Sequence, residues 1–245
     1  MNPKISIITV SFNAQAFIER TIRSVIEQNY SNIEYLVIDG NSKDGTVDII
    51  KSYQDRIDFW LSEPDKSHFD AMNKGIKRAS GDYILILNAG DRLESPETLT
   101  NAMKGTNNED FIYSRAEYIN EKGERWPWHK KTPTPDKLSK RSFINGMVIC
   151  HHCMIVKRSI TPLFMLEPWK VSNDIDWAIR VMENVKNVHF WDNVFCLYLE
   201  GGISKVQKWK AVRERFDISL THFGGFYTIL EQFRILGQLV YKKLR

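Results

Sequence analysis

The sequence predicts an α/β fold in which helices flank a central, mostly parallel sheet. Apolar runs of strand length recur along the chain, the first two of them at residues 5–10 and 35–38. Between these runs, apolar residues recur at helical spacing over residues 17–26, with Ser11 or Asn13 placed to cap the helix. A strand, a helix and a second strand in this order predict a parallel pair joined by a right-handed crossover.

The composition is typical of one globular domain, and we expect residues 1–245 to form it. Of the 245 residues, 42% are hydrophobic and 26% are charged. Three cysteines, an odd number, disfavour a disulfide framework and favour a reducing compartment such as the cytoplasm. No apolar run approaches the ~20 residues of a membrane span, and the run at residues 5–10 is a strand rather than the core of a signal peptide. The net charge of +4 supports at most a weak attraction to anionic ligands, and we expect no nucleic-acid partner.

Polar residues follow two of the predicted strands at their carboxyl ends, where open α/β sheets bind ligands. Asp39 ends the second strand and begins a loop that contains two glycines. A later strand, residues 81–87, breaks off into Asn-Ala-Gly-Asp at residues 88–91. We expect Asn88 and Asp91 to bind a ligand there, and a plain turn rich in Asn, Gly and Asp is the alternative.

A third predicted strand, residues 57–61, precedes a predicted helix over residues 69–79. Asp70, Asn73 and Lys74 recur in it at spacings of three and four residues, so they share a face and can contact one ligand together. A solvated polar face is the alternative.

Four segments occur in an order that resembles the nucleotide-binding half of the family 2 inverting glycosyltransferases, which have the GT-A fold. The resemblance covers roughly the first hundred residues, with weaker similarity to about residue 204. The segments are Thr-Val-Ser-Phe-Asn at residues 9–13, Val-Ile-Asp-Gly-Asn-Ser at residues 37–42 with Asp-Gly-Thr at residues 44–46, Asp-Ala-Met-Asn-Lys-Gly at residues 70–75, and residues 81–91.

This resemblance implies that the donor is a nucleotide-diphosphate sugar. Phe12 and its neighbours at the first strand end would flank the base, and Asp39 would hydrogen-bond the base or the ribose. Asn88 would face the ribose or the diphosphate. Asp91 would hold Mg²⁺ or Mn²⁺, since such an ion stabilises the charge of a departing diphosphate. The predicted donor site consists of Thr9, Phe12, Asn13, Asp39, Asn41, Asp70, Asn73, Lys74 and Asn88.

The sequence departs from the family pattern at two points. The family usually has Asp-x-Asp-Asp where residues 88–91 are Asn-Ala-Gly-Asp, so Asp91 is the one carboxylate left in this tetrapeptide. Many members carry Arg where Met72 stands, which leaves Lys74 or Lys66 as the phosphate partner.

The second half of the chain begins with a predicted strand at residues 111–114 and a predicted hairpin over residues 118–126. Residues 127–141 then contain three prolines and five basic side chains. We expect this segment to be a mobile loop that closes over donor and acceptor.

Residues 150–153, Cys-His-His-Cys, raise the question of a zinc site. We predict a strand over residues 148–156, in which the two cysteines would point to opposite faces, and the sequence has no second cysteine pair, so zinc is disfavoured. His151 is the more interesting residue, because related enzymes often carry a histidine here on the acceptor side of the pocket. A buried core histidine is the alternative.

The family has an acidic pair, commonly Glu-Asp, where this chain has Asn173 and Asp174 ahead of a predicted helix. By this resemblance Asp174 is the catalytic base. Inversion at the anomeric carbon requires a carboxylate that takes the proton of the acceptor hydroxyl, on the face opposite the departing diphosphate. A helix N-cap is the alternative role for Asp174, and Asp176 is the alternative base. The predicted acceptor side consists of His151, Trp177, Gly201 and Gly202.

The C-terminal segment, residues 205–245, predicts one or two helices. Apolar side chains between residues 226 and 244 alternate with basic ones, which is typical of an amphipathic helix. Such a helix either packs against the domain or lies on a membrane. We therefore divide the domain into a nucleotide-sugar-binding half (1–115), an acceptor-side half (116–204) and the C-terminal helices.

We expect a metal-dependent, inverting glycosyltransferase that moves a sugar from a nucleotide-diphosphate sugar to a hydroxyl of a glycan or lipid-linked acceptor. By family analogy, its setting is bacterial cell-surface polysaccharide biosynthesis in the cytoplasm, and peripheral contact with the inner face of the cell membrane is a hypothesis. A non-catalytic nucleotide-sugar-binding protein is the alternative, suggested by the missing carboxylates at Asn88 and Gly90. A nucleotidyltransferase is disfavoured, because its glycine-rich first turn with Arg and Lys is absent.

Overall fold

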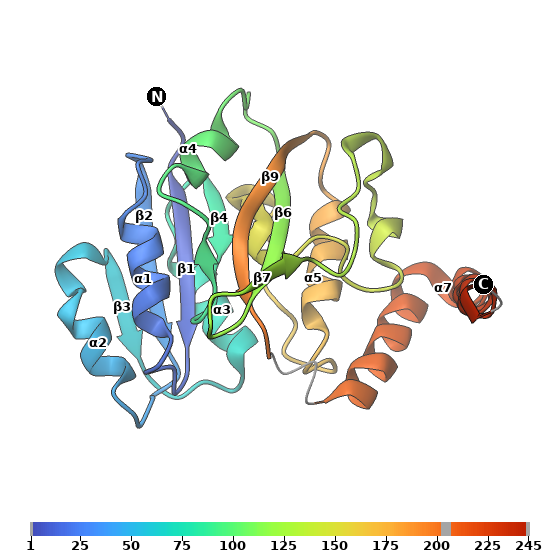
Figure 1. Cartoon of the computed structure of the whole chain (residues 1–245), viewed down its shortest axis with the longest axis horizontal. Helices are drawn as coiled ribbons and strands as arrows, with labels where there is room; N and C mark the ends of the chain where they lie inside the picture. The colour runs from blue at the N-terminus through green and yellow to red at the C-terminus, as the bar shows by residue number, and fades with distance from the viewer. Residues whose placement is uncertain (1, 202–206, 244–245) are drawn as a thin grey trace.

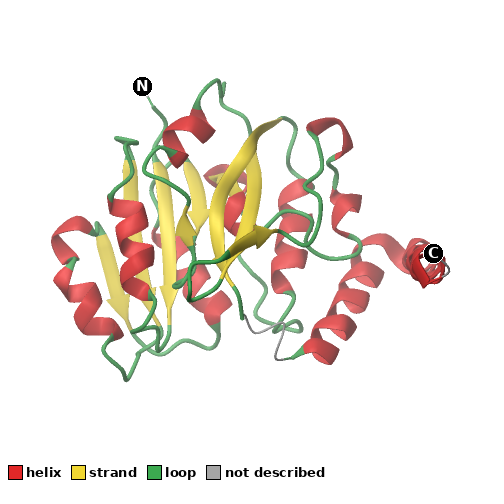
Figure 2. Ribbon diagram, viewed as in Figure 1, coloured by secondary structure: helices red, strands yellow, loops and turns green. Residues whose placement is uncertain are grey.

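The computed structural model describes residues 2–201 and 207–243 and has the predicted α/β fold. Helices flank a nine-stranded sheet whose strand order is β3-β2-β1-β4-β8-β6-β9-β5, with β7 paired to β6 (Figure 1, Figure 2). The sheet is mixed, with parallel pairing throughout its N-terminal half.

The N-terminal half is built from strand–helix–strand units, as predicted. Its four strands run parallel, and the register pairs Ser11 with Asp39, so β1 and β2 end side by side. The elements are β1 (Ile5–Ser11), α1 (Ile18–Ile26), β2 (Ile33–Asp39), α2 (Thr46–Ser52), β3 (Phe59–Ser62), α3 (His68–Arg78) and β4 (Tyr83–Ile86).

The C-terminal half joins the same sheet through β8, which is antiparallel to both β4 and β6. Next to it, β6 and β9 run parallel, and β5 pairs antiparallel with β9. The predicted hairpin is confirmed, since β7 pairs antiparallel with β6 across a turn at residues 120–124. The elements are β5 (Arg92–Leu93), α4 (Thr98–Met103), β6 (Phe111–Ile119), β7 (Arg125–Pro127), β8 (Met154–Lys157), α5 (Asn173–Met182) and β9 (Val188–Leu199). Short 3₁₀ turns between them are η1 (Gln54–Arg56), η2 (Pro135–Lys137), η3 (Lys140–Phe143), η4 (His151–Cys153) and η5 (Arg158–Ile160).

Close packing of α3 on β1 positions one wall of the later site. Strand β1 is buried along its whole length, as its continuous apolar run predicts. Gly75 of α3 lies so near β1 that a Cβ atom there would be 2.3 Å from Ile8 Cγ2. Glycine therefore allows the helix to approach this closely without a clash with the Ile8 side chain. The helix begins after Ser67, whose side chain accepts a hydrogen bond from Asp70 N.

The prediction of a strand over residues 148–156 is wrong for the first half of this segment. His151–Cys153 forms the 3₁₀ turn η4, and the strand begins only at Met154. The turn redirects the chain, so the histidine pair is presented at the end of β8 and not along it.

The predicted cap of the first helix is also wrong. Helix α1 begins at Ile18 after Phe17, and no side chain caps it. Asn13 instead has φ 47°, and its Oδ1 accepts a hydrogen bond from Lys43 N, which ties the turn after β1 to the loop after β2.

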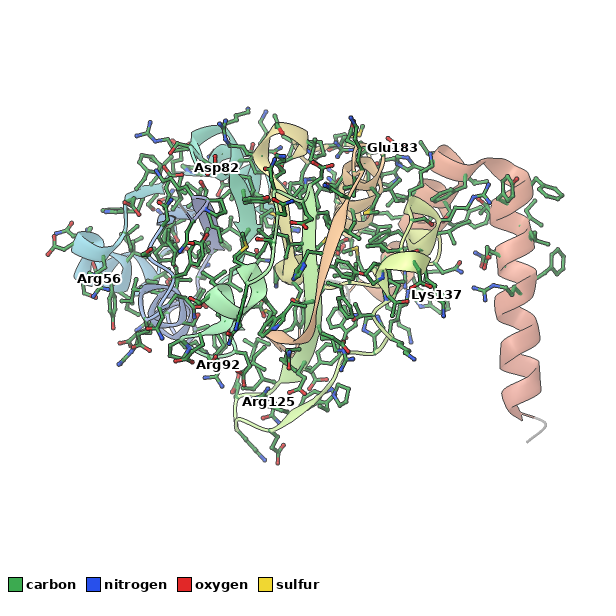
Figure 3. All side chains as sticks on the ribbon, turned by 90° about the horizontal axis from the view of Figure 1, so that it is seen from above. Arg56, Asp82, Arg92, Arg125, Lys137 and Glu183 are labelled. Carbon is green, nitrogen blue, oxygen red and sulfur yellow. The ribbon has the colours of Figure 1, made fainter. Side chains whose placement is uncertain are left out.

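The C-terminal segment forms α7 (Lys208–Lys243), which is broken at Gly224 with φ 76° and ψ 167°. Two helical segments result, in agreement with the prediction. The second segment extends away from the sheet (Figure 3). In residues 2–201 and 207–243, no helix is long and apolar enough to cross a membrane.

Candidate active site

A cavity of about 790 Å³ lies at the carboxyl ends of β1 and β4. From the N-terminal half, its wall includes Phe12 after β1, Met72 on α3 and Asn88 after β4. From the C-terminal half it includes His151 and Asp174. The two halves therefore meet around one cavity, at the sheet edge where open α/β sheets bind ligands.

Asp174 lies in the first turn of α5, and Ser172, not Asp174, is the N-cap residue. Its side chain remains 24% accessible, which leaves the carboxylate within reach of a molecule in the cavity. Burial raises the pKa of Asp174 to about 6, because exclusion of water disfavours the charged form. A carboxyl group with a pKa close to neutral pH is well suited to accept a proton.

His151 stands next to Asp174, with 3.8 Å between His151 Nδ1 and Asp174 Oδ2. Burial, together with repulsion from His152 and His68, holds the pKa of His151 well below its usual value, so the ring is neutral at pH 7. Its Nε2 is buried, and nothing in the described part of the chain hydrogen-bonds to it. Buried polar atoms are normally paired, so an unpaired ring nitrogen on a residue of the cavity wall is unusual.

Asp91 lies behind the cavity wall and does not line it. Asp91 Oδ1 accepts a hydrogen bond of 2.6 Å from Leu199 N, and Oδ2 lies 2.8 Å from His152 Nδ1. Burial lowers the pKa of His152, but the charges of Asp91 and Cys150 outweigh it and hold this pKa well above its usual value. Asp91 and His152 therefore form a buried ion pair that joins the turn after β4 to η4.

These contacts do not fit a divalent metal ion at Asp91. Both of its carboxylate oxygens already have protein partners, and Gly90 contributes no side chain. Among the described residues, no group of three His, Cys, Asp or Glu side chains could hold a metal ion. Mg²⁺ and Mn²⁺ prefer oxygen ligands, and Asn88 is the one residue of this tetrapeptide that both lines the cavity and carries a side-chain oxygen. The metal role of Asp91 remains a prediction that this geometry does not support.

Asp39 organises the ends of three strands from a fully buried position. Its Oδ1 accepts hydrogen bonds from Ser11 Oγ at 3.0 Å and Ser42 Oγ at 2.5 Å. Its Oδ2 accepts from Ser42 N at 2.9 Å and Ser62 Oγ at 2.7 Å. These hydrogen bonds hold the ends of β1, β2 and β3 together. The Asp39 side chain does not line the cavity, and its predicted contact with the nucleotide remains a prediction.

Phe12 and Asn88 are the two predicted donor residues that line the cavity. Phe12 is 66% exposed directly after β1, which suits a flat apolar surface that packs against a base. Asn88 Oδ1 is buried, and no donor in residues 2–201 and 207–243 reaches it. This oxygen can therefore accept a hydrogen bond from a ligand.

The remaining predicted donor residues make structural contacts away from the cavity. Asn73 clamps a distant loop, since its side chain donates to Phe164 O at 2.8 Å and accepts from Phe164 N at 2.7 Å. Lys74 Nζ lies 2.6 Å from a carboxylate oxygen of Asp65. The residues outside the cavity wall are Thr9, Asn13, Asn41, Asp70, Asn73 and Lys74.

The predicted acceptor side is brought together only in part. His151 and Gly201 line the cavity, whereas Trp177 stacks on Phe164 in the core at 5.1 Å between ring centroids. Trp177 Nε1 donates a hydrogen bond to the backbone carbonyl of Pro162, and the side chain is buried, so it cannot contact a ligand in the cavity. Gly202 lies outside the described residues.

Asp176, the alternative base, does not line the cavity. It is 1% exposed, and it accepts a hydrogen bond of 2.7 Å from Arg180 Nε. Its other oxygen lies 2.8 Å from His222 Nε2 on α7. These contacts fix α5 to α7, which leaves Asp174 as the carboxylate at the cavity.

Sequence reasoning missed an aromatic and basic part of the wall. Trp128 stacks on Tyr118 with 5.0 Å between centroids and meets the edge of Tyr198. Lys130 and Arg215 also line the cavity. The prolines and basic residues of residues 127–141 indicated a loop near the site. No sequence pattern predicts that this loop meets α7, which begins more than sixty residues later.

The family model described as glycosyl transferase family 2 matches residues 6–162, well over half of the chain. An uncharacterized glycosyltransferase of Mycobacterium tuberculosis is 41% identical over 103 residues, which are 42% of this chain and 39% of that protein. The match thus spans well under two thirds of the length of that relative. The putative teichuronic acid biosynthesis glycosyltransferase TuaG of Bacillus subtilis is 24% identical over 230 residues, 90% of each protein.

Solved structures share the fold at low identity. TarS 1–349 of Staphylococcus aureus in complex with UDP-GlcNAc has a TM-score of 0.69 and 17% identity, covering 90% of this chain and 67% of that one. The mannosyltransferase PcManGT of Pyrobaculum calidifontis, in complex with GDP-Man and Mn²⁺, has a TM-score of 0.65 and 15% identity, covering 90% and 65%. These likenesses confirm the predicted GT-A-like fold. Taken with the family match, they show that the chain belongs to glycosyl transferase family 2.

Proposed function

We propose that this protein is an inverting glycosyltransferase that transfers a sugar from a nucleotide-diphosphate sugar to a hydroxyl group of a glycan or lipid-linked acceptor. The observation that carries the proposal is the accessible Asp174 carboxyl group on the cavity wall, whose pKa burial raises to about 6. The cavity of about 790 Å³ is large enough for such a donor, since ligand sites commonly measure ~300–1,000 Å³.

The donor binds in the N-terminal half, residues 1–115, on the wall formed by the ends of β1 and β4. Phe12 offers a ring face to the base, and Asn88 Oδ1 accepts a hydrogen bond from a ribose hydroxyl. The ion pair of Asp91 and His152 supports this wall from behind, by holding η4 against the turn after β4. The acceptor binds in residues 116–204, where His151 and Asp174 lie.

In the transfer step, Asp174 takes the proton of the acceptor hydroxyl as its oxygen attacks the anomeric carbon. The bond between that carbon and the diphosphate oxygen breaks, and the nucleotide diphosphate leaves with the electron pair. Attack from the face opposite the leaving group inverts the configuration. His151, neutral beside the base, adds no charge that would oppose the proton transfer.

The test is release of nucleotide diphosphate from a panel of sugar nucleotides, with either Mn²⁺ or EDTA present. We expect Asp174→Asn to lower turnover by roughly 10²–10⁴-fold while donor affinity stays the same. Asp55→Asn, at an exposed position on η1, serves as the matched control and should behave as the wild type. The comparison of Mn²⁺ with EDTA tests the metal dependence that the sequence predicts.

A non-catalytic nucleotide-sugar-binding protein is the second candidate, favoured by the engaged oxygens of Asp91. Binding of sugar nucleotides without release of nucleotide diphosphate, even when crude lipid acceptors are supplied, would replace the transferase proposal by this one.

We also propose that the protein works at the cytoplasmic face of the cell membrane, in cell-surface polysaccharide assembly. The putative role of TuaG in teichuronic acid biosynthesis supports this by analogy. Exposed apolar side chains recur at helical spacing on each of the two segments of α7, and Lys208 and Lys210 flank the first of them, Trp209, with positive charge. This charge suits anionic lipid headgroups. We call these residues the α7 stripe: Trp209, Val212, Phe216 and Leu220 in the first segment, and Phe226, Ile229, Leu230 and Phe233 in the second. Their exposure does not fit the alternative that this face packs against the domain.

A further inference from the structure

Two basic side chains from distant parts of the chain come together in the cavity wall. Lys130 belongs to the loop after β7, and Arg215 belongs to α7. Gly146 lies beside both, since a Cβ atom built on it would be 3.4 Å from Lys130 Nζ and 3.3 Å from Arg215 Cδ. The glycine, with φ 99°, therefore leaves the room in which the two side chains meet.

Neither cation has an acidic partner. Lys130 Nζ donates to Asn145 O at 2.7 Å, and Arg215 Nε donates to Ala211 O at 3.1 Å. For the chain as described, no carboxylate lies within ion-pair distance of either side chain. Burial lowers the pKa of Lys130, and repulsion from the positive charge of Arg215 lowers it further, to about 8. Because cations that are partly removed from water are normally paired, this arrangement indicates an anionic ligand.

The pair lies on the same side of the cavity as the proposed base. Ser172, two residues before Asp174, donates from Oγ to Ala211 O at 3.3 Å, the same carbonyl that Arg215 contacts. Glu214 reinforces this link, since its Oε2 accepts from Ser172 N at 2.8 Å. Arg215 is thereby fixed next to the N-terminus of α5, which carries Asp174.

We propose that Lys130 and Arg215 bind an anionic group, a phosphate or a carboxylate, of the acceptor. The inference rests on the proposed function, in which the base removes a proton from the acceptor on the side opposite the departing diphosphate. Groups around the base therefore contact the acceptor. Arg suits this task because its guanidinium matches the geometry of carboxylate and phosphate. The ring face of Trp128 in the same wall offers a flat apolar surface to the sugar that carries the charge.

The experiment measures binding of three probes to the full chain by calorimetric and NMR titration. Methyl β-glucuronide supplies a carboxylate, glucose 1-phosphate supplies a phosphate, and methyl β-glucoside is the neutral reference. We expect at least one charged probe to bind about tenfold or more tightly than the neutral one. Lys130→Gln and Arg215→Gln should each remove most of this difference, and the two charged probes show which anion the site prefers.

Matched controls come from the same two elements. Lys131→Gln removes a charge from the adjacent exposed position, and Arg213→Gln removes one from a side chain of α7 that is 86% exposed. Both controls should retain wild-type affinity for the charged probes. Lys130→Arg and Arg215→Lys retain the charge, so partial recovery in them separates loss of binding from loss of folding.

Equal affinity for charged and neutral probes would overturn the proposal, and so would an equal loss in the two controls. Weaker binding of UDP or GDP in the Gln variants, with unchanged binding of the charged probes, would also overturn it and assign the pair to the donor. Release of nucleotide diphosphate from sugar nucleotides, with crude lipid acceptors supplied, is recorded on the same protein preparations. If the wild type releases none but still binds the charged probes, the proposed function fails and the anion site stands.

Discussion

Of the two adjacent histidines in η4, His152 is positively charged and His151 is neutral, because their neighbours differ. His152 Nδ1 lies 2.8 Å from a carboxylate oxygen of Asp91, and this charge holds its pKa high despite burial. His151 Nδ1 is 3.8 Å from Asp174, a carboxyl whose own pKa is raised, and burial leaves the ring neutral. Desolvation thus raises the pKa of Asp174 and lowers that of His151. The result is a carboxylate that ionises near neutral pH beside an uncharged ring.

The pKa of Asp174 predicts the acid limb of the pH profile. The base must be deprotonated, so turnover divided by KM should fall about tenfold per pH unit below pH ~6 and level off above it. Nucleotide release measured from about pH 5 to about pH 8 checks this, with Asp174→Asn expected to show a low rate without that limb. A profile that stays flat down to about pH 5, as an ordinary carboxyl group with a pKa of about 4 would give, would show that burial does not tune this group in solution.

At the scale of elements, the turn between β4 and β5 excludes the family's second aspartate by its backbone. Gly90 has φ 105°, a conformation that L side chains rarely adopt, and a Cβ atom there would lie 2.9 Å from Leu199 Cδ2. Asn88, two residues earlier, faces the cavity under no such restraint.

Gly90→Asp should therefore destabilise the protein without creating a metal site. Backbone strain of ~1–3 kcal/mol corresponds to a fall in Tm of roughly 2–12 °C for a domain of this size. Thermal unfolding monitored by circular dichroism measures it. Gly225→Asp is the matched control: a Cβ atom there meets nothing within 4 Å and the backbone φ is not left-handed, so its Tm should stay within about 2 °C of the wild type. If Gly90→Asp is equally stable, and Mn²⁺ raises its Tm, the turn can accommodate the aspartate.

Most helices and strands could be predicted from the sequence, because the periodicity of apolar residues and the turn-forming residues determine structure within short segments. The strand ends at Asp39, Asn88 and Asp91 were placed correctly by the same reasoning. The orientation of their side chains could not be predicted, because it depends on partners from other segments. Ser42 and Ser62 engage Asp39, and η4 supplies His152 to Asp91. The meeting of Lys130 with Arg215 is likewise a product of the tertiary fold.

At the scale of the whole molecule, α7 joins the candidate active-site cavity to an apolar outer surface. Ala211 and Arg215 on one face line the cavity, while Trp209 and Phe216 on another are exposed. A lipid surface on the α7 stripe would therefore lie one helix diameter, about 10 Å, from the acceptor side of the cavity. This distance suits a lipid-linked acceptor whose sugar lies close to the membrane surface.

This arrangement predicts binding to anionic membranes through the α7 stripe. The wild type should cosediment with phosphatidylglycerol-containing vesicles and much less with pure phosphatidylcholine, because Lys208 and Lys210 add electrostatic attraction to apolar burial. Trp209→Ser combined with Phe216→Ser should weaken partitioning by about tenfold or more, since burial of each large apolar side chain contributes ~1.5–3 kcal/mol. Leu163→Ser, at a side chain that is 40% exposed outside the stripe, is the matched control and should bind as the wild type does. Equal sedimentation of the double variant and the control would exclude the stripe as the membrane contact, and the acceptor would then have to reach the cavity by another route.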